Sequence, residues 1–160
     1  MTFDGVDDYI ATTFAQNLPA LTVAVWVRSP AAPASGVTAG PVQREANFQI
    51  NWNHGDAGYR GAAALRVAGR WYAASFGTLN ANTWYHLTAT YDGEVLRTYR
   101  DGLLITSNAA PSGPPDAESK PMTFGRHATR PDRFFAGSID EVKIFDRALN
   151  DAEVAALTSD

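Results

Sequence analysis

Aromatic rings and hydrogen-bonding side chains are interleaved along residues 44–72 in a way that suits a sugar ligand. Sugars present flat apolar faces and hydroxyl edges, and proteins meet them with exposed aromatic rings and with amide, guanidinium and imidazole groups. Within 52–59, two glycines and several polar residues predict a loop with an aromatic residue at each end. The candidate ligand-binding residues are Arg44, Gln49, Asn51, Trp52, His54, Tyr59, Arg60 and Trp71.

Several of these candidates have an equally simple structural explanation. Trp52 shares the alternation phase of the apolar residues before it, so it can pack between sheets instead of forming a platform for a sugar. Trp71 and Tyr72 are adjacent in a β-prone run, so only one of them can face the core. His54 and Tyr59 can be solvated loop residues. The sequence leaves these alternatives open.

Acidic residues near both ends of the chain suggest a calcium site. Asp4, Asp7 and Asp8 surround Gly5, and Asp140 lies in a late β-prone run. Calcium binds carboxylate and carbonyl oxygens, and carboxylates gathered without a cation repel one another. If the first and last strands pair, the expected ligands are the side chains of Asp4, Asp7 and Asp140 with a carbonyl near Gly5. The alternative is that Asp4 and Asp7 cap a turn through side-chain hydrogen bonds.

A basic loop is predicted over 126–133 (RHATRPDR), whose charges sum to +2 when histidine is neutral. Arginine offers a planar fork of N–H donors that fits carboxylate and sulfate groups. The loop therefore suits an acidic sugar, although a solvated surface loop explains the same composition.

Composition limits the class of protein. Of the 160 residues, 45% are hydrophobic and 19% charged, which is enough apolar material for a core and too little charge for a disordered chain. No apolar run approaches the roughly 18 residues that cross a bilayer, and no signal-peptide pattern is visible. A net charge of −4 with scattered arginines argues against nucleic acid. The absence of cysteine excludes disulfides and thiolate sites.

Alternation of apolar and polar residues predicts β-strands along most of the chain. The clearest run is 21–28, in which Leu21 and every second residue after it are apolar. Further runs are 48–52, 63–67, 70–76, 85–91, 94–100, 122–125 and 137–145. Glycine-containing turns at 67–70, 91–94 and 100–103 predict hairpins between neighbouring strands.

One short helix is predicted at the C-terminal end. Asn150 is its expected N-cap, and Glu153 has the spacing of a capping box for a helix over 150–157. Many short strands and one terminal helix predict an all-β fold, an antiparallel jelly-roll β-sandwich of two sheets with a short C-terminal helix.

Five motifs follow one another along the chain: 3–10 (FDGVDDYI), 21–27 (LTVAVWV), 82–93 (NTWYHLTATYDG), 99–102 (YRDG) and 135–149 (FAGSIDEVKIFDRAL). In this order they resemble the laminin G-like domains of the concanavalin A-like lectin/glucanase superfamily. The resemblance identifies 1–160 as a single domain of this kind, with two curved sheets. It also implies an extracellular protein that binds carbohydrate, often attached to secreted enzymes or adhesins, with calcium near the joined ends of the chain.

Catalytic signatures of the related enzymes are missing. The glucanases carry their carboxylates in a Glu-x-Asp-x-(x)-Glu pattern on one strand, whereas alternation sends the neighbouring Asp140 and Glu141 to opposite faces. Alginate lyases of jelly-roll type carry Gln-Ile-His or Gln-Val-His on a strand, and here Asn51 replaces the histidine after Gln49 and Ile50. We therefore expect no catalytic activity.

The expected function is that of a non-catalytic carbohydrate-binding module of a secreted multidomain protein. It would bind a polysaccharide or glycan on the concave sheet and the adjoining loops, with a structural calcium ion. We expect a secreted or cell-surface location, a signal peptide outside this chain, no nucleic-acid partner and no membrane insertion. One alternative is a structural or adhesion domain that binds proteins and has no sugar site. The other is a small polysaccharide lyase or hydrolase.

Overall fold

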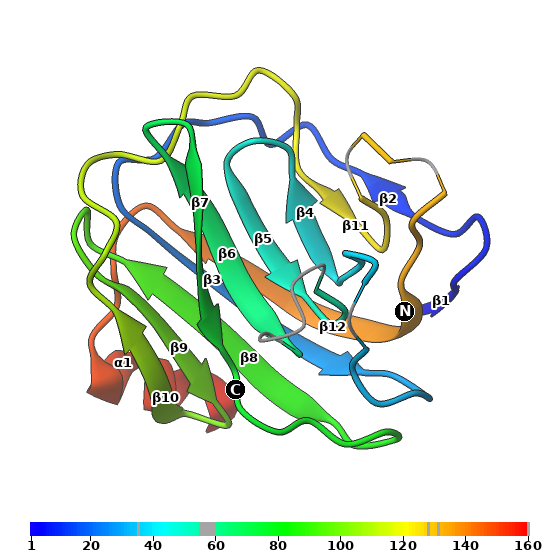
Figure 1. Cartoon of the computed structure of the whole chain (residues 1–160). Helices are drawn as coiled ribbons and strands as arrows, with labels where there is room; N and C mark the ends of the chain where they lie inside the picture. Colours follow the sequence, from blue (N-terminus) through cyan, green and yellow to red (C-terminus); the bar gives the residue numbers. More distant parts are fainter. Residues whose placement is uncertain (35, 55–59, 128, 131, 160) are drawn as a thin grey trace.

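Two six-stranded antiparallel sheets face each other in the computed structural model (Figure 1), which describes residues 1–34, 36–54, 60–127, 129–130 and 132–159. Sheet 1 has the strand order β1-β12-β3-β8-β9-β10, and sheet 2 has the order β2-β11-β4-β5-β6-β7. The strands of sheet 1 are β1 (Thr2–Asp4), β3 (Leu21–Arg28), β8 (Tyr85–Tyr91), β9 (Leu96–Arg100), β10 (Leu103–Asn108) and β12 (Ala136–Phe145). Those of sheet 2 are β2 (Ile10–Ala11), β4 (Val42–Arg44), β5 (Phe48–Asn51), β6 (Ala62–Val67), β7 (Arg70–Ser75) and β11 (Thr123–Phe124). This arrangement confirms the predicted β-sandwich.

The core lies between the sheets and is built by alternation. In β3, Leu21, Val23, Val25 and Val27 all belong to the buried cluster, as their period-two spacing predicts. Sheet 2 contributes the inward-facing residues of β5 and β6, and loops add further large side chains to the same cluster. Because the inner faces take the large apolar residues, the outer face of each sheet is left for other contacts.

The longest runs were predicted most accurately. β3 and β8 begin and end at the expected residues. Two of the predicted hairpin turns have positive φ at both central residues, at Ala68 and Gly69 and again at Asp101 and Gly102, which matches the right-handed twist of paired strands. No alternating run predicted β1, β2, β4 or β10, and β1 was expected only as the first strand that pairs with the last. The first three have only two or three residues, and β10 contains a register shift that interrupts its alternation.

The first strand pairs with the last, as predicted. In the antiparallel β1–β12 pair, Phe3 lies opposite Gly137, and the Met1 amino group donates a hydrogen bond of 2.9 Å to the carbonyl of Ile139. Gly137 is required here because a Cβ at this position would lie 2.3 Å from the carbonyl oxygen of Arg28. β12 continues past β1 to pair with β3, and this pairing places the chain's N-terminal strand on sheet 1.

A β-bulge in β12 contradicts the expectation that Asp140 and Glu141 point to opposite faces. Asp140 pairs with Trp26 and Lys143 with Ala24, so β12 has one residue more than β3 between these pairs. Glu141 takes the extra position with φ of 45°. Both carboxylates consequently lie on the outer face of sheet 1, where they line one shallow pocket with Trp26 and Trp84.

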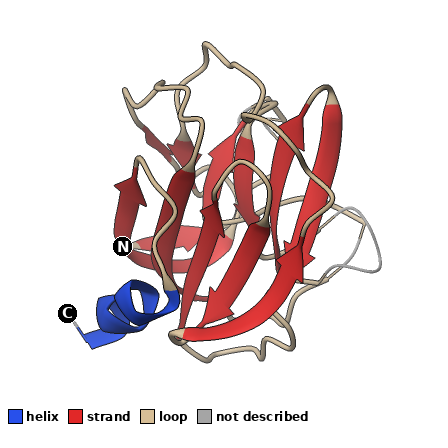
Figure 2. Cartoon of the chain, turned by 90° about the vertical axis from the view of Figure 1, so that its left-hand side faces the viewer, coloured by secondary structure: helices blue, strands red, loops and turns tan. Residues whose placement is uncertain are grey.

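The helix α1 (Asp151–Ala156), continued by the 3₁₀ turn η1 (Leu157–Ser159), packs beside sheet 1 (Figure 2). The predicted capping box is confirmed, with reciprocal hydrogen bonds between Asn150 and Glu153. Val154 and Leu157 form a second, smaller apolar cluster with Tyr99 and other residues of the outer face. No helix in the described part of the chain is long and apolar enough to span a membrane.

Replacing Trp52 by alanine is expected to lower the free energy of unfolding by about 3–5 kcal/mol. Trp52 is only 1% exposed, contacts the rings of Tyr85 and Phe135, and donates an indole hydrogen bond of 2.9 Å to the carbonyl of Ala31. Trp84→Ala is the matched control, because this side chain is 42% exposed and should cost less than about 1 kcal/mol. Equilibrium denaturation with urea measures both values, and equal losses in the two variants would contradict the assignment of Trp52 to the core.

Candidate functional site

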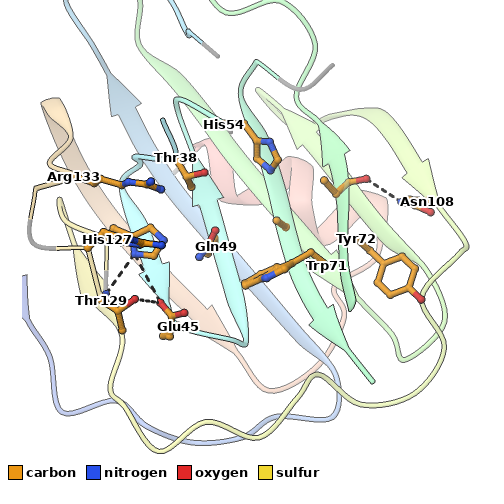
Figure 3. Close-up of a pocket in the computed structure, with 13 residues that line it drawn as sticks. Thr38, Glu45, Gln49, His54, Trp71, Tyr72, Asn108, His127, Thr129 and Arg133 are labelled. Atoms are coloured by element: carbon orange, nitrogen blue, oxygen red, sulfur yellow. Dashed lines mark hydrogen bonds and ion pairs between the residues drawn. The ribbon is translucent and has the colours of Figure 1, made fainter. Parts of the chain in front are cut away.

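A groove of about 640 Å³ opens on the outer face of sheet 2 (Figure 3). Its floor includes Gln49, Ala64 and Ala73, which lie opposite one another on β5, β6 and β7. The neighbouring residues of these strands point inward to the core, so alternation sends these three outward. Two of the three are alanines, which leave space above the sheet where larger side chains would fill it.

One wall of the groove is aromatic. Trp71 is 45% exposed and Tyr72 is half-buried, and both lie on the edge strand β7. Tyr72 packs partly against the core, whereas Trp71 belongs with Ala73 to the outward phase. Asn108, at the end of β10, also lines the groove, and its Nδ2 donates a hydrogen bond of 2.9 Å to the carbonyl of Ala73. This contact fixes the end of β10 beside the edge of sheet 2.

The opposite wall is polar and is held by a small network (Figure 3). Thr129 Oγ1 donates to Glu45 Oε2 at 2.6 Å, and Thr129 N–H donates to His127 Nδ1 at 3.4 Å. Nδ1 therefore acts as an acceptor, which is the neutral form of the ring with its proton on Nε2. His127 Nδ1 lies 3.8 Å from Glu45 Oε2. The network joins the turn after β4 to the loop after β11.

Burial of His127 lowers the pKa of its imidazole, and the nearby guanidinium groups of Arg133 and Arg130 act in the same direction. The carboxylate of Glu45 opposes this effect without reversing it. The imidazole is therefore neutral near pH 7, in agreement with its role as a hydrogen-bond acceptor. Both arginines line the groove beside it.

Three of the predicted ligand-binding residues lie together in this groove: Gln49, His54 and Trp71. The structure also resolves the alternative at 71 and 72, because Trp71 is the residue that faces outward. Arg60 is exposed but does not line the groove. Tyr59, the remaining loop candidate, lies outside the described residues.

The predictions for Asn51 and Trp52 were wrong, because both side chains are buried. Trp52 belongs to the core between the sheets, which was the alternative left open by its phase. Asn51 has no exposed surface. Its Oδ1 accepts a hydrogen bond of 2.6 Å from Gln43 Nε2, and its Nδ2 donates at 3.2 Å to Gln49 Oε1. Asn51 therefore lies beside Gln49 on the same face of β5 and orients its amide.

Arg44 was also wrongly predicted as a ligand-binding residue. It is buried, and its guanidinium donates to the carbonyls of Ala15, Glu118 and Lys120 at 2.7–3.2 Å. It makes further hydrogen bonds to the carbonyl of Gln16 and to the side chains of Asn17 and Asn47. A buried guanidinium requires such partners, and here they tie two long loops to sheet 2. No donor remains for a ligand.

Sequence reasoning missed most of the polar wall. Glu45 lies 84 positions from Thr129, so no local spacing relates it to the rest of this wall. Only the basic loop 126–133 gave a signal, since its composition suited an acidic sugar without showing where the loop lies. The groove residues that were not predicted are Thr38, Glu45, Tyr72, Asn108, His127, Thr129, Arg130 and Arg133.

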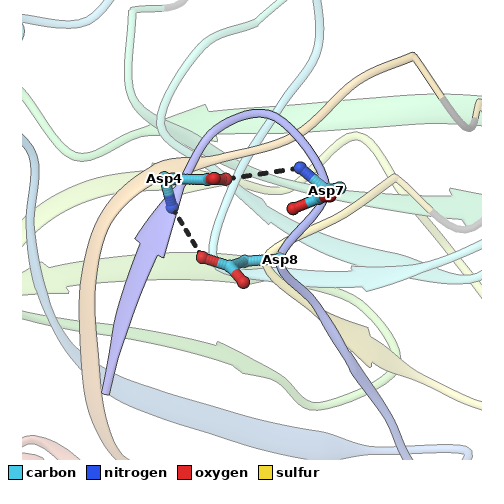
Figure 4. A group of neighbouring side chains, drawn as sticks. All are labelled: Asp4, Asp7 and Asp8. Atoms are coloured by element: carbon cyan, nitrogen blue, oxygen red, sulfur yellow. Dashed lines mark hydrogen bonds between the residues drawn. The ribbon is translucent and has the colours of Figure 1, made fainter.

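The acidic residues near the N-terminus form a tight exposed cluster (Figure 4). Asp4, Asp7 and Asp8 each place one carboxylate oxygen within 4.8 Å of the others. Asp4 Oδ1 accepts the N–H groups of Val6 at 2.7 Å and Asp7 at 3.3 Å, which is the turn-capping alternative. These hydrogen bonds lower the pKa of the Asp4 carboxyl. In the part of the chain that is described, none of the three carboxylates has an ion-pair partner.

Asp140 was wrongly included among the calcium ligands. Ala136 is the residue that pairs with Asp4, and Asp140 lies four residues further along an extended strand, about 13 Å away. Its place near the cluster is taken by Asp8. Gly5 lies at the cluster with φ of 82°, and a Cβ there would approach Ala136 Cβ to 2.8 Å. The remaining oxygen donors are of the hard type that calcium prefers, so the chemistry of this set fits the ion.

Comparison with known families places nearly the whole chain in one group. The family model described as the concanavalin A-like lectin/glucanases superfamily matches residues 4–155. A search of curated protein sequences gave no match.

Solved structures share the fold at low sequence identity. Domain 4 of AbnA, a GH43 extracellular arabinanase from Geobacillus stearothermophilus, in complex with arabinotriose, superposes with a TM-score of 0.71 at 19% identity, over 89% of this chain and 68% of that one. A provisionally assigned carbohydrate-binding protein from Bacteroides ovatus superposes with a TM-score of 0.75 at 17% sequence identity. The match covers 95% of this chain and 45% of that one. The binding domain of Paraclostridial Mosquitocidal Protein 1 superposes with a TM-score of 0.69 at 18% sequence identity. The match covers 99% of this chain and 45% of that one. The chain thus spans less than half of the last two proteins.

Stability is expected to fall as the pH drops below about 6.5, and His127→Gln should reduce this loss. The pKa of His127 is lowered in the folded chain, whereas the unfolded chain keeps the ordinary value near 6.5. Acid therefore protonates the unfolded chain first, which favours unfolding. Urea denaturation from pH 7.5 to 5.5 measures the free energy of unfolding. In His127→Gln, the slope of this free energy against pH should decrease by no more than about 1.4 kcal/mol per pH unit.

The loss will not vanish in this variant, because burial also lowers the pKa of His86. The double variant with His86→Gln should flatten the profile further. An unchanged slope after replacement of His127 would show that the pKa of its imidazole is the same in the folded and the unfolded chain.

Proposed function

The chain belongs to the concanavalin A-like lectin/glucanase superfamily, and we propose that it is a non-catalytic carbohydrate-binding module that holds a glycan in the groove on sheet 2. The observation that carries this proposal is the pairing of an exposed tryptophan with polar groups across one groove. Trp71 offers an apolar ring face, while Gln49 and His54 lie on the floor and at the rim. This combination suits a ligand with flat apolar faces and hydroxyl edges.

The side-chain amide of Gln49, on the floor of the groove, is held in one orientation before a ligand binds. Gln49 Oε1 accepts a hydrogen bond from Asn51 Nδ2, which sets the amide orientation. Gln49 Nε2 is not bonded to any acceptor among the described residues, so its N–H groups are available to a hydroxyl oxygen. Because Asn51 is itself held by Gln43, the donor is fixed before the ligand arrives, which lowers the entropy cost of binding.

The groove does not offer the groups that glycoside hydrolysis needs. That reaction uses two carboxyl groups that flank the scissile bond. Among the described lining residues, Glu45 is the only acidic one, and its Oε2 already accepts a hydrogen bond from Thr129. Asp140 and Glu141 share a face, but they lie on sheet 1, on the other side of the sandwich. We therefore propose binding without catalysis.

The relatives support a role as one part of a larger extracellular protein. The AbnA domain was solved with arabinotriose and belongs to an extracellular arabinanase, and the chain covers only part of each of the compared proteins. We propose that this chain is likewise secreted or displayed at the cell surface and linked to further domains. By holding a polysaccharide, it would raise the effective concentration of a linked domain at that polymer.

We also propose that Asp4, Asp7 and Asp8 hold a calcium ion together with a carbonyl near Gly5. The support is the convergence of three exposed carboxylates at the point where the chain leaves β1. An ion there would relieve their mutual repulsion and stiffen the turn next to the β1–β12 pair.

Trp71→Ala is expected to weaken polysaccharide binding by about tenfold or more. A tryptophan ring that the ligand covers contributes a large share of the binding energy. Affinity electrophoresis against a panel of plant and bacterial polysaccharides identifies the ligand, and calorimetry then gives the change. Trp84→Ala is the control, since that exposed tryptophan lies in the pocket on sheet 1. A larger loss with Trp84→Ala than with Trp71→Ala would move the site to the other face.

The same panel separates the alternative functions. If no polysaccharide is retained, the proposal fails and an adhesion domain that binds proteins becomes the better reading. If soluble sugars are released from any polymer, the proposed absence of catalysis is wrong.

Calcium is expected to raise the midpoint of thermal unfolding, and a chelator should reverse the rise. At a hundredfold excess over the dissociation constant, a single site adds about 2.7 kcal/mol. The double change Asp7→Asn and Asp8→Asn should abolish the response while it keeps the Asp4 side chain that caps the turn. Asp140→Asn should respond as the unchanged protein does. A midpoint indifferent to calcium would leave the cluster as a capped turn alone.

A further inference from the structure

We infer that the groove on sheet 2 selects anionic glycans, whose sugars carry carboxylate or sulfate groups. The inference rests on the proposed function and names the class of ligand for the same groove. Two arginines, Arg130 and Arg133, line it on the polar side. In the described part of the chain, neither guanidinium has a carboxylate within ion-pair distance.

The single acidic side chain of the lining does not neutralise these arginines. Glu45 directs Oε2 to the Thr129 hydroxyl at 2.6 Å and lies 3.8 Å from His127 Nδ1. The Thr129 hydroxyl fixes this carboxylate in the wall, and its one negative charge does not balance the two positive charges. Two cationic groups face the groove against one committed carboxylate, although the chain as a whole carries a net charge of −4. The local excess of positive charge is a property of this groove and not of the overall composition.

The loop that carries the arginines is fixed at its base. His127 N–H donates to the carbonyl of Arg133 at 2.9 Å, and Arg133 N–H donates to the carbonyl of Arg130 at 3.0 Å. Phe135 N–H in turn donates to the carbonyl of Gly125 at 2.8 Å, which closes the loop onto β11 and β12. These bonds hold the backbone groups of Arg130 and Arg133, which reduces the backbone entropy that is lost when a ligand binds.

The two walls divide the recognition of a sugar between them. Figure 3 shows Arg133 and His127 on one side of the groove and Tyr72 on the other, with Trp71 between them beside Gln49. A pyranose that stacks on Trp71 would present the substituents of its ring to the arginine side. An arginine fork binds a carboxylate or sulfate through two parallel hydrogen bonds. A neutral sugar would leave the two charges partly desolvated without a partner, which is unfavourable.

The experiment compares polymers that differ only in charge. Calorimetry at low salt measures binding of polygalacturonate and alginate, each beside its methyl ester, and of dextran sulfate beside dextran. We expect at least one acidic polymer to bind about tenfold or more tightly than its neutral form, with the preference reduced in 0.5 M NaCl. The first two pairs report a carboxylate ligand and the third a sulfate ligand.

Variants assign the preference to the groove. Arg133→Gln and Arg130→Gln should each weaken binding of the acidic polymer and so reduce its preference over the neutral form. Arg60→Gln is the control, because this exposed arginine lies outside the groove lining and should bind as the unchanged protein does. Thermal unfolding confirms that each variant is folded.

Two outcomes would overturn the inference in different ways. If a neutral polysaccharide binds as well as its acidic form, and Arg133→Gln has no effect while Trp71→Ala does, the groove binds glycans without selecting charge. The proposed function would then stand and the anionic specificity would fall. If no polymer binds at all, both fall together.

Discussion

Pairing of the first strand with the last is the constraint on which the rest of the molecule depends. β12 lies between β1 and β3, so it joins the N-terminal strand to the centre of sheet 1. Without this pairing, Phe3 would lose its place in the core and the turn that gathers Asp4, Asp7 and Asp8 would have no fixed base. The acidic cluster is therefore a consequence of how the sheet closes. The groove lies on the other sheet, which packs against the same core.

The groove exists because alternation assigns different sizes of side chain to the two faces of sheet 2. Large apolar residues such as Phe48 and Leu65 point inward, and Ala64 and Ala73 point outward. Loops from three separate parts of the chain then rise around this floor of small residues. Arg44 ties two of the long loops to the sheet from inside. A buried cation thus contributes to the fold and has no place in the lining of the groove.

Local patterns in the sequence were sufficient for the regular parts of the fold. β3 and β8 alternate over seven or eight residues, and the capping box of α1 is a contact between residues three positions apart. Strands of two or three residues, such as β2 and β4, are defined only by their partners in the sheet. The same limit applies to the site. Trp71 and Gln49 were found because their residue types suit a sugar, whereas Glu45 and His127 meet only after folding. Arg44 was misassigned because its type suggested a surface residue, although its phase matches that of the buried Val42.

The bulge at Glu141 gives β12 two hydrophobic registers in one strand. Ile139 before it and Ile144 after it both reach the main core, although five positions separate them and an uninterrupted strand would turn them to opposite sides. The extra residue also lets Phe145 reach the helix cluster on the outside. Deletion of Glu141 would leave the two isoleucines four positions apart, a spacing that an uninterrupted strand places on one side, so the shortened β12 would keep both of them against the core without the bulge.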